Sequence, residues 1–251
     1  MSEAKRLLIL GGTGEAVALA EKAQSQYSDR LDVIYSLAGR VKPERIIAAT
    51  VRVGGFGGGN GLADFLKAEE INLVIDATHP FAVNISANAH DACLSSLTPR
   101  LMLNRPSWDM PTEAKYLEAE DMPDAARMLS GLAKRVLVTT GQSQLDALAA
   151  CPETYFVIRV IEEPANPPEI KDFTFLCDRP PYSLENEIAL MQEHKIDALL
   201  TKQSGGKGTV AKIVAAIKRG IPIVMLRRPL PEPGESVETV EEALRWLGNR
   251  I

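Results

Sequence analysis

Residues 6–15 have the sequence RLLILGGTGE, in which an apolar run leads directly into a glycine-rich turn. The residues that follow place Ala16, Ala20 and Ala23 on one face of an expected helix. A buried strand, a glycine turn and a helix are together typical of the first unit of a dinucleotide-binding fold. Glycines let the backbone approach a pyrophosphate, and the start of the helix favours its negative charge. The stretch therefore predicts a mainly parallel sheet covered by helices.

Short β-rich runs alternate with helical patterns along the rest of the chain. This alternation predicts an α/β protein of two Rossmann-like parallel-sheet halves, with the active site in the cleft between them. Strands are expected at residues 6–10, 32–36, 51–53, 73–76 and 101–103 in the first half, and at 135–139, 155–161, 174–176, 198–201 and 222–226 in the second. Prolines between residues 105 and 111 mark the boundary, which predicts a nucleotide-binding domain at 1–105 and a substrate-binding domain at 106–251.

Two helices of the second half have clear sequence signals. Val210, Ile213, Val214 and Ile217 form one apolar stripe that predicts a helix ending at Gly220. The last helix is expected to begin after Ser236, whose hydroxyl would cap its amino terminus.

The composition excludes several classes of protein. Among 251 residues, 45% are hydrophobic and 24% are charged, which is the composition of a globular protein, and the net charge of −5 argues against nucleic-acid and anionic-membrane partners. The first apolar run is too short for a secretion signal or a membrane span, so we expect a cytoplasmic protein. Cys93, Cys151 and Cys177 are widely spaced and form no C-x-x-C pair, so neither a disulfide framework nor a metal site is expected.

The glycine turn is the expected site for the cofactor pyrophosphate, with contacts from Gly12, Thr13, Gly14 and Glu15. The usual G-x-G-x-x-G pattern is incomplete, because Val17 occupies the position of the third glycine. The alternative is a tight turn between strand and helix that binds no ligand.

The end of the second strand indicates which dinucleotide is bound. An NAD site normally has an acid there for the ribose 2′-hydroxyl. Residues 35–40 instead read YSLAGR, and Ser36, Gly39 and Arg40 suit a 2′-phosphate. NADPH is therefore the expected cofactor. The alternative is that Arg40 is only a solvated surface charge.

A second glycine cluster at residues 54–59 follows the third strand at the same edge of the expected sheet. Gly55, Phe56 and Gly57 are expected to form a wall against the cofactor, and the alternative is a flexible loop without a ligand.

The turn after the fourth strand contains Thr78, His79 and Pro80. It lies at the edge where the nicotinamide ring is expected, so these residues are predicted to border the cofactor, and His79 is the candidate catalytic residue. A structural histidine is the alternative. Neither His90 nor His194 has metal-ligand spacing from it.

The second half contains another strand, glycine loop and helix. Its loop offers Lys202, Ser204, Gly205, Gly206 and Lys207. Gly208 follows Lys207 where a nucleotide-triphosphate loop has serine or threonine, so a carboxylate is the better anion. The alternative is an ordinary connection with solvent-facing lysines.

Other substrate contacts are expected around this loop. Thr140, Gly141 and Ser143 offer hydroxyls and backbone donors after a strand, unless they only cap a helix. Arg159 lies inside a strand and either reaches the substrate or pairs with an acid. Tyr182 and Ser183 are further candidates, although Ser183 also suits the N-cap of the next helix.

Several motifs together resemble the precorrin-6A reductase family. They are GGTGE at 11–15, AGR at 38–40, DATHPFA at 76–82, RPSW at 105–108, RPPYS at 179–183 and TKQSGGKGT at 201–209. The resemblance spans nearly the whole chain. The histidine-proline and lysine-serine-glycine-glycine motifs, in that order, are its most specific parts.

The resemblance implies NADPH-dependent reduction of a ring double bond in a polycarboxylated tetrapyrrole, with hydride delivered to C19, in cobalamin biosynthesis. The positive groups, Arg105 among them, would then hold the substrate carboxylates. His79 or a water would supply the proton. Channelling of the tetrapyrrole to other corrin-pathway enzymes is an additional expectation.

Three alternatives remain from the sequence. Cobalt-precorrin-6A reductases of the anaerobic route look very similar, so the substrate is expected with or without cobalt. A short-chain dehydrogenase would need Tyr-x-x-x-Lys, which is absent. A non-catalytic NADP-binding redox sensor is a third hypothesis, and the anion-binding loops of the second half argue against it.

Overall fold

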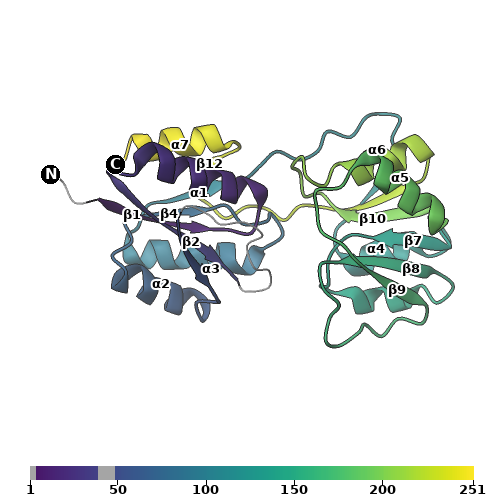
Figure 1. Cartoon of the computed structure of the whole chain (residues 1–251). Helices are drawn as coiled ribbons and strands as arrows, with labels where there is room; N and C mark the ends of the chain where they lie inside the picture. The colour runs from purple at the N-terminus through teal and green to yellow at the C-terminus, as the bar shows by residue number, and fades with distance from the viewer. Residues whose placement is uncertain (1–3, 39–48) are drawn as a thin grey trace. The chain divides into compact units, whose positions relative to one another are not determined.

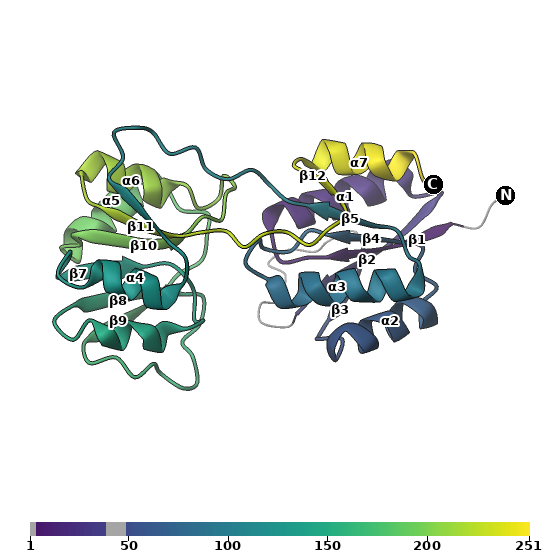
Figure 2. The same cartoon turned by 180° about the vertical axis from the view of Figure 1, so that it is seen from behind.

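The computed structural model describes residues 4–38 and 49–251. The chain forms two compact units: unit 1 contains Met1–Pro106 and Pro229–Ile251, and unit 2 contains Ser107–Arg228. Each unit is a six-stranded sheet with helices (Figures 1 and 2). The predicted α/β class with two parallel-sheet halves is confirmed. No described helix is long and apolar enough to cross a membrane.

The sheet of unit 1 has the strand order β12-β5-β4-β1-β2-β3, and every pairing is parallel. Its strands are β1 (Lys5–Leu10), β2 (Leu31–Leu37), β3 (Thr50–Val53), β4 (Leu73–Asp76), β5 (Arg100–Leu103) and β12 (Glu235–Val237). Its helices are α1 (Gly14–Tyr27), α2 (Gly58–Ala68), α3 (Val83–Ser96) and α7 (Val240–Gly248).

Helices cover both faces of this sheet, and the side chains of β1 show why. Leu7 and Ile9 pack with α1 and α7 on one face. Leu8 and Leu10 pack with α2 and α3 on the other. Figure 1 shows α7 beside α1, and Figure 2 shows α2 and α3 together on the opposite face. A strand buried on both faces must be apolar at every position, which explains the continuous apolar run at its centre.

Unit 2 has the strand order β6-β11-β10-β7-β8-β9, again with only parallel pairs. Its strands are β6 (Tyr116–Ala119), β7 (Arg135–Val138), β8 (Tyr155–Val160), β9 (Phe173–Cys177), β10 (Ala198–Lys202) and β11 (Ile223–Leu226). Its helices are α4 (Met122–Leu129), the 3₁₀ helix η1 (Leu145–Ala150), α5 (Leu184–Glu193) and α6 (Ala211–Arg219). Helices α5 and α6 pack on one face of the sheet, and α4 contacts η1.

The two sheets share one pattern. In unit 1, β2 and β3 lie on one side of β1, and β4 and β5 lie on the other. In unit 2, β7 takes the central place, with β8 and β9 on one side and β10 and β11 on the other. The sixth position is filled by β12, which follows unit 2 in the chain, and by β6, which precedes the other strands of unit 2. In each sheet the order in which successive strands are added therefore reverses once, between β1 and β4 in unit 1 and between β7 and β10 in unit 2. Ligands of this fold class bind at such a point.

The ten predicted strands are all present, with ends within one residue of the prediction, and the helix ending at Gly220 is confirmed. The strands β6 and β12 were not predicted. Each lies at a sheet edge, and β12 is only three residues long, so neither has a buried apolar pattern that the sequence would reveal.

Two predictions about the end of the chain are wrong. The substrate-binding domain was expected to run to residue 251, but Pro229–Ile251 belongs to unit 1, because β12 pairs with β5 and α7 packs on α1. Ser236 does not cap the last helix, because it lies in β12. The cap is Thr239, whose hydroxyl accepts the Glu242 N–H while the Glu242 carboxylate accepts the Thr239 N–H.

Because α7 completes the core of unit 1, a cavity in α7 should destabilise that unit alone. Leu247 is fully buried in α7. Leu247→Ala is expected to lower the free energy of unfolding of unit 1 by about 2 to 5 kcal/mol. The two tryptophans of the chain give separate readouts, since Trp246 lies in unit 1 and Trp108 in unit 2. Urea unfolding is followed by fluorescence in Trp108→Phe and Trp246→Phe backgrounds.

The control is Leu94→Ala, which removes an exposed leucine of α3 in the same unit and should have little effect. An equal shift of the Trp108 transition in the Leu247→Ala protein would contradict the assignment of the C-terminal segment to unit 1.

Candidate functional site

In unit 1, the loops after β1 and β4 meet at the point where the strand order reverses. The Thr13 hydroxyl accepts the Ala16 N–H at 3.1 Å, which caps α1, and donates to the Ala77 carbonyl oxygen at 2.8 Å. The Ala77 N–H in turn donates to the Leu10 carbonyl at 3.0 Å. One side chain therefore starts the helix and joins the two loops.

The glycine turn packs against the Tyr35 ring on one side and leaves space beside Gly12 and Gly14 on the other. A Cβ at Gly11 would come within 2.3 Å of the Tyr35 ring, whereas one at Gly12 or Gly14 would meet no atom of the described residues within 4 Å. Gly12 also has a φ of +114°, which favours glycine, and its N–H donates to the Tyr35 hydroxyl at 3.1 Å. Burial raises the pKa of Tyr35, so its phenol stays protonated at neutral pH. Open main chain at a helix start is what a dinucleotide pyrophosphate requires.

Beyond β4, Asp76 holds the turn that carries the predicted histidine. Its Oδ1 accepts the Thr78 N–H at 3.1 Å and the Thr78 hydroxyl at 2.7 Å. His79 is half-buried, and its Nδ1 accepts the Phe81 N–H at 3.2 Å. In the neutral ring the proton is therefore on Nε2, which can act as a donor. His79 and Pro80 follow β4 at the same edge as the glycine turn, as predicted.

Two residues that the sequence assigned to different ligands are bonded to each other. Arg105 was expected to bind substrate and Glu15 to bind cofactor. Arg105 Nη1 lies 2.7 Å from Glu15 Oε2, and both side chains are largely shielded from solvent. Both belong to unit 1, where the pair ties the segment after β5 to the first turn of α1. Their contacts with ligands stay predictions.

The ends of β2 and β3 contain a basic residue that the sequence analysis missed. Ser36 pairs in register with Arg52, and its side chain is buried. The Arg52 guanidinium lies 3.9 Å from the centroid of the Phe56 ring. Arg52 lies in a short β-rich run that leads into the glycine cluster, and no signal in the sequence shows that it lies beside Ser36. Gly39 and Arg40, predicted for this edge, lie outside the described residues.

The glycine cluster after β3 has a defined conformation. Gly57 is the N-cap of α2, with φ of +80°, and Phe56 packs against the core and meets Phe65 edge-on at 5.1 Å. A Cβ at Gly61 would lie 1.9 Å from the Phe56 carbonyl oxygen. The segment containing Gly55 therefore has its shape from packing, and its predicted contact with cofactor stays a prediction.

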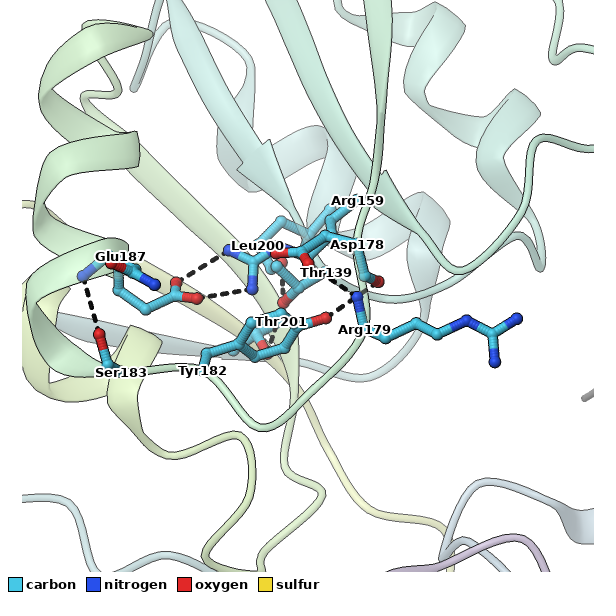
Figure 3. Close-up of polar contacts among 10 residues, drawn as sticks. Thr139, Arg159, Asp178, Arg179, Tyr182, Ser183, Glu187, Leu200 and Thr201 are labelled. Carbon is cyan, nitrogen blue, oxygen red and sulfur yellow. Dashed lines mark hydrogen bonds and ion pairs between the residues drawn. The ribbon is translucent and has the colours of Figure 1, made fainter. Parts of the chain in front are cut away.

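Unit 2 has a corresponding pair of loops after β7 and β10. The Thr139 hydroxyl donates to the Thr201 hydroxyl at 3.0 Å and approaches the Leu200 carbonyl at 3.3 Å (Figure 3). Thr140 is buried, and its hydroxyl makes no hydrogen bond to any described residue. Neither Thr140 nor Ser143 caps η1, whose N-cap is Gln144, so the capping alternative is wrong. Gly141 has φ of +78°.

The loop after β10 combines a half-buried lysine with buried main chain. Burial lowers the pKa of Lys202. Ser204 is buried and its N–H donates to the Lys202 carbonyl at 2.8 Å. Gly205 and Gly206 have positive φ values of +65° and +80°. Lys207 is exposed. The loop thus presents one partly desolvated cation and a turn of glycines, a combination suited to a carboxylate.

A glutamine that was not predicted holds this loop in place. The Gln203 side chain accepts the Trp108 N–H at 3.0 Å and donates to the Trp108 carbonyl at 3.1 Å. The Trp108 indole donates to the Gly206 carbonyl at 2.8 Å. Arg228 donates to the Gln203 carbonyl at 3.1 Å. Trp108 and Arg228 lie next to the two places where the chain passes between units, so both connections are fastened to this loop.

Arg159 on β8 pairs with an acid, which is one of the two predicted alternatives. Its Nη1 and Nη2 bond to Glu187 Oε1 and Oε2 at 2.6 and 2.9 Å, and both side chains are buried (Figure 3). Burial alone would lower the pKa of Arg159, but the bonds and charge of Glu187 outweigh it and raise the pKa. No sequence signal identified Glu187. A direct substrate contact by Arg159 stays a prediction.

Tyr182 and Ser183 both have local roles beside this pair. The Tyr182 ring lies 4.2 Å from the Arg159 guanidinium carbon, and its hydroxyl donates to the Asp178 carbonyl at 3.2 Å. Ser183 caps α5 by accepting the Asn186 N–H, as the capping alternative predicted. Among the described residues, no group of three or more His, Cys, Asp or Glu side chains could hold a metal ion.

The chain matches the family model described as precorrin-6x reductase CbiJ/CobK over residues 6–248. It belongs to this reductase family. A precorrin-6A reductase of Rhodococcus erythropolis is 44% identical over 97% of both chains, and one of Mycobacterium tuberculosis is 40% identical over 96% of this chain and 97% of the relative. A solved structure named CobK precorrin-6A reductase has a TM-score of 0.89 and 31% identity, covering 98% of this chain and 96% of its own.

The buried ion pair in unit 2 of this family member should be costly to break. Glu187→Ala leaves the Arg159 charge buried without its partner, so we expect the free energy of unfolding of unit 2 to fall by about 3 to 5 kcal/mol. Urea unfolding is followed by Trp108 fluorescence in the Trp246→Phe background. Glu185→Ala removes an exposed glutamate from the same helix and is the matched control. Equal stability of the two variants would show that the pair contributes nothing.

Proposed function

We propose that the protein reduces precorrin-6A to precorrin-6B with NADPH in cobalamin biosynthesis, delivering hydride to C19 of the macrocycle. The observation that carries the proposal is the open glycine turn of unit 1, in a chain whose 44% identical relative is a precorrin-6A reductase. The relatives named cobalt-precorrin-6A reductase are less similar, at 26% identity for that of Priestia megaterium, which favours the metal-free substrate.

The residues of unit 1 fit a dinucleotide. Gly12 and Gly14 leave room for it along the main chain, and the positive end of α1 would favour the negative charge of its phosphates. When bound, NADPH supplies the hydride for the ring carbon. Thr78 and His79 follow β4, where the nicotinamide half of the cofactor is expected in this fold. These residues would orient the nicotinamide half of the cofactor.

Reduction of a ring double bond needs one hydride and one proton. His79 is our candidate for the proton, because it follows β4, where the nicotinamide is expected; it would give the proton as an imidazolium and return to the neutral ring. His79→Asn keeps hydrogen-bonding capacity without a titrating proton. A loss in kcat of about a hundredfold or more in this variant, together with loss of the pH dependence of kcat, supports a role as general acid. A loss in kcat below about tenfold assigns His79 to positioning.

The direct test is an anaerobic assay of the purified protein with metal-free and cobalt-bound precorrin-6A. We expect NADPH oxidation in step with a product heavier by two hydrogen atoms, faster with the metal-free substrate and with NADPH than with NADH. Absence of turnover with either substrate would overturn the proposal. Equal rates with NADH and NADPH would contradict the proposed preference for NADPH.

Lys202 is proposed to bind a carboxylate of the tetrapyrrole. A charge-assisted hydrogen bond contributes about 1.5 to 3 kcal/mol, so Lys202→Ala should lower kcat/KM by tenfold or more and leave NADPH affinity unchanged. Lys218→Ala, an exposed lysine at the end of α6, is the control. Loss of NADPH affinity in the Lys202 variant would place this loop in the cofactor site instead.

The same lysine predicts a pH effect. Burial lowers the pKa of Lys202, so the cation is present below that pKa and is lost as pH rises through it. The fall of kcat/KM at alkaline pH should therefore occur at a lower pH than that at which a lysine usually loses its proton. In Lys202→Arg the cation persists, and this fall should move to higher pH.

A further inference from the structure

Arg52 stands at the carboxyl end of β3 and is held there by main-chain oxygens. Its guanidinium donates to the Gly54 carbonyl and, through Nη2, to the Gly55 carbonyl at 2.8 Å. Nη1 also lies 3.5 Å from the Ser36 hydroxyl, on the residue that pairs with Arg52 across β2 and β3. These contacts fix the guanidinium at the ends of two neighbouring strands.

Aromatic rings support the same group. The guanidinium carbon lies 3.9 Å from the centroid of Phe56 and 5.1 Å from that of Phe65. The faces of aromatic rings attract a cation electrostatically. An arginine side chain held in this way loses little further conformational entropy when it binds a ligand. The side chain is half-buried, so part of it still faces solvent. The position is therefore ordered before any ligand arrives.

Among the residues that the structure describes, no carboxylate balances the charge of Arg52. Its partners among the described residues are carbonyl oxygens, a hydroxyl and aromatic rings, and it forms no ion pair with any acid in that part of the chain. Guanidinium groups bind phosphates bidentately and more strongly than neutral acceptors. An anion is therefore a ligand that suits the Arg52 guanidinium.

The location indicates which anion fits. In this fold the adenosine ribose is bound at the end of the second strand, where an acid selects a free 2′-hydroxyl and an arginine accommodates a 2′-phosphate. Here β2 ends with Ser36 and Leu37 and offers no acid. Resting on the NADPH dependence proposed above, we propose that Arg52 binds the 2′-phosphate and makes the protein prefer NADPH to NADH.

This inference changes the role predicted for Ser36. The sequence suggested that its hydroxyl contacts the phosphate, but the residue is only 4% exposed and its hydroxyl lies 3.5 Å from Arg52 Nη1. Ser36 is therefore a positioning residue that helps to hold the guanidinium. The contact predicted for Arg40 lies outside the described residues and stays a prediction.

The test measures cofactor binding directly, by titration calorimetry of the whole chain without substrate. In Arg52→Ala, the affinity for NADP⁺ should fall about tenfold or more, while that for NAD⁺ changes less than about threefold. Adenosine 2′,5′-bisphosphate should weaken by a similar factor, and adenosine 5′-monophosphate should not. Arg52→Glu should reduce NADP⁺ affinity further, because its carboxylate repels the 2′-phosphate.

Arg30→Ala is the matched control, since it removes the same charge from an exposed residue directly before β2, at the opposite edge of the sheet. Ser36→Ala should weaken NADP⁺ only slightly. Circular dichroism and the Trp246 unfolding transition show whether each variant is folded. If Arg52→Ala is not folded, Arg52→Lys is used instead, because it keeps the charge and the aliphatic stem. A selective loss of NADP⁺ affinity in Arg52→Lys leads to the same conclusion.

The outcomes separate this inference from the proposed function. If the unaltered protein binds NADP⁺ no more tightly than NAD⁺, the proposed NADPH dependence fails. If the unaltered protein prefers NADP⁺ and folded Arg52 variants keep that full preference, Arg52 is not the discriminating residue, and the proposed function stands without it.

Discussion

The burial of β1 on both faces is the constraint on which unit 1 depends. Leu8 and Ile9 are fully buried on opposite sides of the strand, so helices must cover the sheet above and below. As a parallel strand covered by helices on both faces, β1 ends at the carboxyl edge of the sheet, where the chain turns sharply into α1. The glycine turn, the Thr13 cap and the contact between Thr13 and Ala77 all lie at that end. Core packing therefore determines where the candidate cofactor site is built.

Unit 2 repeats this arrangement with different chemistry in its loops. Around β7 and β10 the polar groups are threonine hydroxyls, a half-buried lysine and a glycine turn, in place of the open glycines after β1. The same sheet order thus supports two candidate anion sites with different chemistry. A pyrophosphate suits main-chain donors at a helix start, whereas a substrate carboxylate suits a desolvated cation.

Two polar clusters of unit 2, one buried and one partly buried, hold its loops in place. The Arg159 and Glu187 pair satisfies two buried charges at once, with the Tyr182 ring against the guanidinium. The Gln203 side chain joins the loop after β10 to Trp108 by two hydrogen bonds. Loops held in this way keep their shape before a ligand binds, which lowers the entropy that binding must overcome.

Local patterns in the sequence determined the fold class, ten of the strands and the glycine turn, because these features depend on side-chain periodicity and on residues with special backbone freedom. The family resemblance also came from short motifs. Tertiary structure alone decided the rest. The strands β6 and β12 take their places from pairing with strands far away in the chain, and their own residues carry no buried pattern. The bonds of Arg105 to Glu15 and of Arg159 to Glu187 span 90 and 28 residues. Arg52 became a candidate only when β2 and β3 placed it beside Ser36, because a single base in a sequence does not reveal which side chain it will meet.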